Sequence, residues 1–163
     1  MKKSISLQLK MSELIYDIQN KTYLTGRSLS EGTNHSHIAN MQANDDDENE
    51  AQILRSITMA YSVLRNRLAE YLETNDSATT NDSFSSEEEL TLTLQMPSNF
   101  NGTVTQSIGE AAHQFIVATA IADWFAITAK GETSDYTLVA ESSLKILEEA
   151  LCKRSRPLRP AKD

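Results

Sequence analysis

The sequence has little of the residue types from which covalent cross-links and many small-molecule sites are built. Its 163 residues include one cysteine, five glycines, three prolines and one tryptophan. A single cysteine excludes an intramolecular disulfide framework, and five glycines leave little from which a phosphate-binding loop can form. The G-x-S-x-G, H-E-x-x-H and C-x-x-C motifs are also absent from the sequence. We therefore expect no cofactor and no enzymatic activity.

Long apolar runs are missing as well. The longest, residues 115–129, is shorter than the roughly 18 residues that a membrane span requires, and Asp123 interrupts it. Residues 1–10 begin with two lysines, but polar and apolar residues then alternate where a secretory signal would have a continuous apolar segment. We expect a protein without a membrane partner that is cytoplasmic in its host cell.

Positive charge is scarce outside the last residues of the sequence. The formal net charge is −8, and residues 153–163 carry +4, so the other residues carry −12. A body this acidic argues against a nucleic-acid-binding domain, which normally shows a basic face. Residues 154–163 are expected to form an extended basic tail, because residues that precede proline disfavour the helix. The candidate contact residues for a partner or for DNA are Lys153, Arg154, Arg156, Arg159 and Lys162.

Two segments have the alternation of half-buried strands. In residues 4–10 and again in residues 90–96, every second residue is apolar, and Pro97 ends the second segment. The two predicted strands pair with each other or with strands of neighbouring copies. A two-stranded ribbon is marginal in water, so a helix or another subunit must cover its apolar face.

Helical periodicity accounts for most of the remaining sequence. Residues 12–26 form a predicted helix that Gly26 ends. Apolar residues at steps of three and four predict a helix over residues 53–72, with Leu72 as its last apolar position. Residues 103–130 are apolar nearly all round in their second half, which is typical of a central helix, and residues 134–153 form its antiparallel neighbour. The apolar stripe predicted on this last helix consists of Tyr136, Val139, Ala140, Leu144, Leu147 and Leu151.

These elements predict a mainly α protein with a four-helix bundle-like core and a small two-stranded β-ribbon. Residues 1–163 are expected to form one domain. Residues 28–49 and 74–88 are polar and are predicted to be loops.

The candidate metal ligands do not have a recognisable spacing. Residues 44–50 contain five carboxylates, but they lack the spacing of a calcium loop, and negative charge here fits the start of a helix. His35 and His37 lie two residues apart in a polar segment, with no cysteine or glutamate to complete a ligand set. We predict no metal site.

Three further residues are chemically suggestive. Asp123 interrupts the apolar helix, and we expect it to lie on the exposed side or to pair with an arginine across an interface, because a buried unpaired charge is costly. His113 is expected at a helix seam with a hydrogen-bonded partner. Ten residues separate the two, about 15 Å along one helix, which is too far for both to act on one atom. Cys152 has no resolving cysteine.

One resemblance narrows the function. The segments NDDDENEAQILRSITMAYSVLRNRLAEYL, LTLTLQMPSNFN, HQFIVATAIADWFAITAKGE and KRSRPLRP resemble small proteins encoded in prophage structural gene blocks. The predicted architecture of residues 45–160 is similar to that of the head–tail connector proteins of tailed bacteriophages. The resemblance implies a ring of several copies around the DNA channel, between portal and tail, and it carries no individual site residue to this chain.

We therefore expect a non-enzymatic structural protein of the virion, of head–tail connector type, that acts as a homo-oligomer and contacts other virion proteins. The basic tail would meet an acidic neighbour, make weak contact with DNA, or bind nothing. The alternative is a cytosolic helical protein-binding or regulatory module that remains monomeric or dimeric. An enzyme that uses Asp123 and His113 is the weakest reading.

Overall fold

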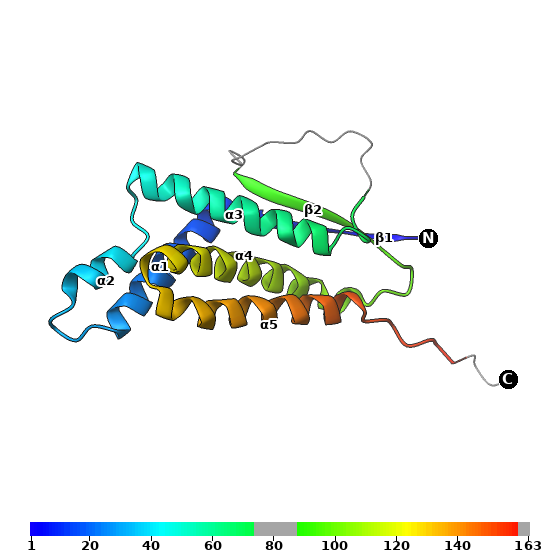
Figure 1. The fold of residues 1–163 in the computed structure, drawn as a ribbon. Helices are drawn as coiled ribbons and strands as arrows, with labels where there is room; N and C mark the ends of the chain where they lie inside the picture. Colours follow the sequence, from blue (N-terminus) through cyan, green and yellow to red (C-terminus); the bar gives the residue numbers. More distant parts are fainter. Residues whose placement is uncertain (74–87, 160–163) are drawn as a thin grey trace.

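The computed structural model of the chain describes residues 1–73 and 88–159. Within these residues lie five α-helices and two β-strands (Figure 1). The mainly α class with a small antiparallel ribbon, predicted from the sequence, is confirmed. Apart from residue 88, the polar loop predicted over residues 74–88 lies outside the described residues.

The ribbon forms within one chain. Strands β1 (Lys3–Lys10) and β2 (Glu89–Met96) pair antiparallel, with Leu7 opposite Leu92. Their apolar faces are buried toward the helices, and α4 (Thr105–Thr128) contacts β1. Residues 71–73 bond to the other edge of β2, where the Gln95 N–H donates to the Tyr71 carbonyl at 2.6 Å. The helical core thus provides the cover that an isolated ribbon lacks.

The N-terminal helices correct two sequence predictions. Helix α1 (Met11–Ser28) continues through Gly26, which the sequence indicates as its end. Helix α2 (His35–Met41) lies inside the loop predicted over residues 28–49, and α3 begins before that predicted loop ends. Tertiary contacts explain α2: the Met41 side chain is fully buried, and the Trp124 indole N–H donates to the Met41 carbonyl at 2.8 Å.

Helix α3 (Asp47–Arg67) has charges that suit its dipole. Its first turn contains three acidic residues and its last turn two arginines, so each end has the charge that the macrodipole favours. The helix ends earlier than the apolar periodicity predicts. Leu68 remains in the core, but Leu72 leaves the helix axis and forms a β-bridge with Leu94.

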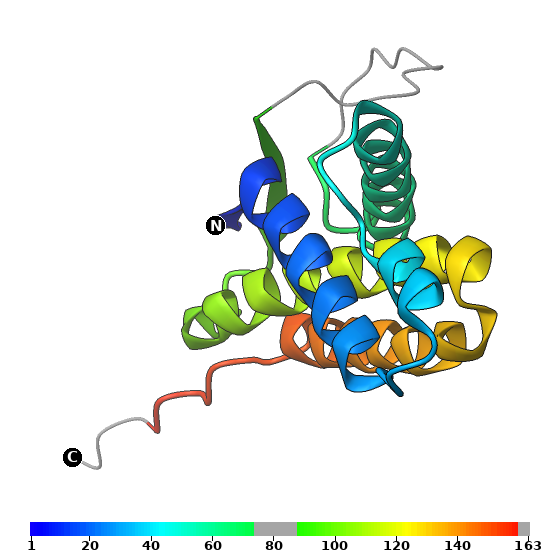
Figure 2. The same ribbon diagram turned by 90° about the vertical axis from the view of Figure 1, so that its left-hand side faces the viewer.

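Helix α4 is the centre of the molecule. A short 3-10 turn (Gly102–Val104) precedes it, a second (Lys130–Glu132) follows it, and α5 (Thr133–Leu151) returns antiparallel to it (Figure 1). Figure 2 shows α4 between α3 and α5. Half of its 24 residues are buried, because α5, α3, α1, α2 and β1 all contact it. This position fits its nearly continuous apolar surface.

Candidate functional site

The chain beyond α5 is fixed to the loop that precedes α4. The Asn101 N–H donates to the Lys153 carbonyl at 3.2 Å, and the Ser155 N–H donates to the Asn99 carbonyl at 2.8 Å. We call residues 153–155 the anchor. These bonds hold the backbone of the anchor against residues 99–101, before the start of α4.

The Arg154 side chain folds back on the C-terminal end of α5. Its Nη1 donates to the Leu151 carbonyl at 2.7 Å and to the Lys153 carbonyl at 3.1 Å. A cation at this position also suits the negative end of the helix dipole. Arg154 therefore caps the C-terminal end of α5 within the chain. Its contact with a partner or with DNA, which the sequence indicates, stays a prediction. Another of those predicted contacts, Lys162, lies outside the described residues.

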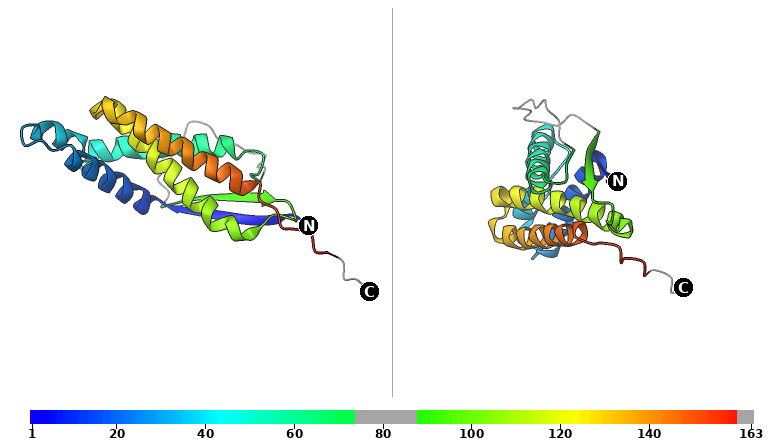
Figure 3. Two further views of the ribbon diagram at one scale, coloured as in Figure 1. Left: turned by 90° about the horizontal axis from the view of Figure 1, so that it is seen from below. Right: turned by 90° about the vertical axis from the view of Figure 1, so that its right-hand side faces the viewer.

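Residues 156–159 leave the body and form what we call the basic arm. All four residues are exposed, and Leu158 is 97% exposed. Figure 3 shows the arm running away from the helices in two views. The arm therefore presents Arg156, Leu158 and Arg159 to whatever approaches it.

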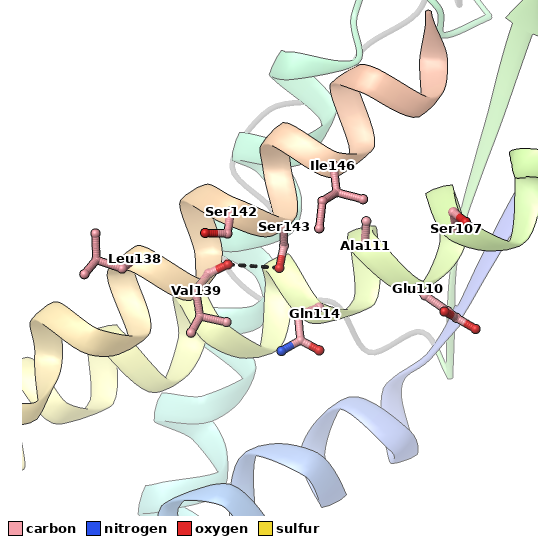
Figure 4. A pocket seen from close by; sticks show the side chains of 9 residues that line it. All are labelled: Ser107, Glu110, Ala111, Gln114, Leu138, Val139, Ser142, Ser143 and Ile146. Carbon is pink, nitrogen blue, oxygen red and sulfur yellow. Dashed lines mark hydrogen bonds between the residues drawn. The ribbon is translucent and has the colours of Figure 1, made fainter. Parts of the chain in front are cut away.

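A groove lies between α4 and α5 on the surface of the bundle. It has a volume of about 500 Å³, and three exposed apolar side chains of α5 contribute to it: Leu138, Val139 and Ile146. Figure 4 shows Ile146 pointing toward Ala111 on α4. The Ser143 hydroxyl donates to the Val139 carbonyl at 2.9 Å, so this buried polar group is satisfied inside the helix. The lining residues are Ser107, Glu110, Ala111, Gln114, Leu138, Val139, Ser142, Ser143 and Ile146. We call this feature the α4–α5 groove.

The two helices that form the groove are acidic. Glu110 lines it directly. Helices α4 and α5 together contain six carboxylates against one basic side chain, Lys145. An apolar surface in a field of negative charge suits a ligand that is both apolar and cationic.

The two polar residues singled out on α4 take part in separate contacts. His113 Nε2 lies 2.6 Å from Asp17 Oδ2 on α1, which confirms a hydrogen-bonded histidine at a helix seam. Asp123 is exposed and accepts a hydrogen bond from the Ser56 hydroxyl on α3. The structure thus places each of them with a different helix and does not bring them together.

The candidate metal ligands remain dispersed. His35 and His37 lie at the start of α2 and are exposed, and Asp45 accepts a hydrogen bond from Gln19 Nε2 at 2.6 Å. Within residues 1–73 and 88–159, no group of three or more His, Cys, Asp or Glu side chains is placed to hold a metal ion. Cys152 is exposed at the end of α5.

The sequence of α5 contains apolar residues that indicate the groove but do not belong to the stripe predicted from helical periodicity. Leu138 and Ile146 lie outside the predicted stripe of α5 yet are apolar and eight residues apart, so they share one face of the helix. Val139, which the sequence places in the stripe, is 38% exposed. The reason is that α5 packs mainly on α4, so its buried stripe is narrow.

Comparison with protein-family models, with curated proteins and with solved structures found no match to this chain.

One helical segment has the length and composition of a membrane span. It consists of the 3-10 turn and α4, Gly102–Thr128, and 56% of its most apolar window is buried inside the protein. The core helix of a helical bundle has the same properties, and α4 occupies that position.

Proposed function

We propose that this protein is a non-enzymatic assembly protein, of the head–tail connector type of tailed bacteriophages, that works as a homo-oligomer in the host cytoplasm and in the virion. One observation carries the proposal: a single chain contains both a protruding basic arm and an acidic, partly apolar groove. Complementary surfaces on one chain allow identical copies to join head to tail, and such contacts close into rings when the rotation permits.

The positions of His113 and Asp123 support a non-catalytic role. His113 and Asp123 lie 10 residues apart on α4 and bond to side chains of two other helices. A general base needs a reacting group within hydrogen-bond distance of the proton it takes, and neither residue is placed to share such a group with the other.

The mass of the protein in solution tests this proposal. We expect sedimentation velocity across increasing protein concentration to reveal a closed oligomer of many copies, and negative-stain microscopy to show rings with a central channel. A molecule that stays monomeric at every concentration would contradict the proposal.

A helical protein-binding or regulatory module is the second candidate function. The α4–α5 groove favours it, because an apolar groove between two helices is a common docking site for a partner segment. A monomer or dimer at all concentrations distinguishes this function from the first.

A further inference from the structure

The α4–α5 groove and the basic arm are complementary in chemistry. The groove has an apolar centre, formed by Val139, Ile146 and Ala111, and the Glu110 carboxylate lies at the same surface. The arm has one large apolar side chain, Leu158, with Arg156 and Arg159 on either side of it. A leucine that fills the centre would bring its two arginines near the carboxylates of α4 and α5.

The arm is also prepared for binding. Pro157 fixes one backbone dihedral angle and favours an extended conformation for the residue before it. The anchor already orders residues 153–155 through backbone hydrogen bonds. Ordering the remaining residues therefore costs less conformational entropy than it would for a flexible chain.

The geometry indicates that the arm and the groove belong to different copies. Leu158 follows Ser155 by three residues, so an extended chain carries it at most about 11 Å from the anchor. Val139 precedes the end of α5 by 12 residues, about 18 Å along the helix axis. Ile146 lies only five residues before the end of α5, about 7.5 Å along the axis, so the Val139 end of the groove is the part that an anchored arm of the same chain does not reach. The arm also points away from the body (Figure 3).

We infer that the basic arm of one copy docks in the α4–α5 groove of a second copy, with Leu158 between Val139 and Ile146. The arm of the second copy is then free to enter a third. This inference rests on the proposed homo-oligomer and names the contact that builds it.

Site-directed disulfide formation tests the contact directly. Two variants are prepared in a Cys152→Ser background. The first carries Leu158→Cys, and the second carries Ile146→Cys together with a tag that changes the mass of the chain. The three side chains involved are exposed, Leu158 at 97% and Ile146 at 54%, so folding should be preserved, and circular dichroism checks it. After mixing and mild oxidation, we expect a disulfide-linked dimer of unequal chains as the main product.

A matched control uses an exposed apolar residue that does not line the groove. Met59 on α3 is 66% exposed, and a Met59→Cys chain should cross-link to Leu158→Cys at least tenfold less. Equal yields from the two positions would mean that the arm has no preferred site, which overturns the inference. In one chain that carries both Leu158→Cys and Val139→Cys, a disulfide within the monomer would also overturn it, because Val139 is the end of the groove that lies beyond the reach of the same chain's arm.

Charge exchange gives an independent readout. The pair Arg156→Glu/Arg159→Glu and the single change Glu110→Lys should each weaken self-association at least tenfold, and combining them should recover part of the loss. If the arginine variant loses affinity for a duplex DNA probe while its self-association is unchanged, the arm serves DNA and the inference fails.

The two proposals fail in different ways. If the wild-type protein does not self-associate, the proposed function and this inference fail together. If it forms oligomers that neither cross-link through Leu158 nor respond to the arm variants, the inference alone is wrong.

Discussion

Gly26 lies inside α1, where α2 packs closely against the backbone. A Cβ atom at this position would be 3.3 Å from the Ile38 methyl group and 3.4 Å from the Ile38 carbonyl. Gly109 in α4 is the opposite case, because a Cβ there would have no neighbour within 4 Å. The two glycines should therefore respond to larger side chains with opposite signs.

We predict that Gly26→Val lowers the free energy of unfolding by about 1–3 kcal/mol, since the added methyl groups have no space against α2. Gly109→Ala should raise it by about 0.4–1 kcal/mol, because alanine loses less backbone entropy in a helix. Urea denaturation followed by circular dichroism measures both. A stabilising Gly26→Val would contradict the close packing of α1 and α2.

Helix α2 depends on contacts outside itself. It has seven residues, which is too short to be stable alone in water. Thr22 on α1 is fully buried; its hydroxyl donates to the Gln19 carbonyl at 3.0 Å and accepts from the Ala43 N–H at 3.2 Å, just beyond α2. This small polar contact, together with the Met41 side chain, holds the end of the helix in place.

Replacing the Thr22 hydroxyl should destabilise helix α2. Thr22→Val keeps the shape of the side chain but leaves the Ala43 N–H buried without an acceptor, which costs about 1–3 kcal/mol. Hydrogen exchange should become faster in residues 35–43 and stay unchanged in α5. As a control, Ser62→Ala on the exposed side of α3 should change stability by less than about 0.5 kcal/mol.

Elements with a strong pattern are predictable from the sequence, and α2 shows why others are not. The strict alternation of β1 and β2 and the apolar second half of α4 predict their structure without help from the rest of the chain. Residues 35–41 have only Ile38 and Met41 as large apolar residues, so no period emerges. Their helix follows from the positions of Thr22 and Trp124, which lie far away in sequence.

The candidate site was only partly predictable for a related reason. The basic residues of the arm can be identified from the sequence alone, because a cluster of charges lies within a few consecutive residues. The groove exists because α5 packs mainly on one helix, α4, and this leaves Val139 partly exposed. The number of helices that pack on α5 cannot be read from its own sequence. A hydrogen bond such as that of Arg154 with the end of α5 likewise needs the path of the backbone.

The molecule as a whole separates its charges. Residues 153–163 carry +4 and the rest of the chain carries −12. Attraction between exposed charges is screened over about 10 Å at 0.1 M salt and about 3 Å at 1 M. Association through arm and groove must therefore weaken when salt is added.

We predict that the dissociation constant of self-association rises by about tenfold or more between 0.1 M and 1 M sodium chloride. Sedimentation at each salt concentration measures it, with the Arg156→Glu/Arg159→Glu variant as a control that should depend less on salt. Association that tightens with salt would indicate a purely apolar contact.

The anchor also has a mechanical consequence. Residues 153–155 are hydrogen-bonded to the chain segment before α4, so no flexible linker separates the arm from the body. The load passes at once to the end of α5 and to the start of the central helix α4. A copy that is pulled by its neighbour therefore transmits force to its central helix.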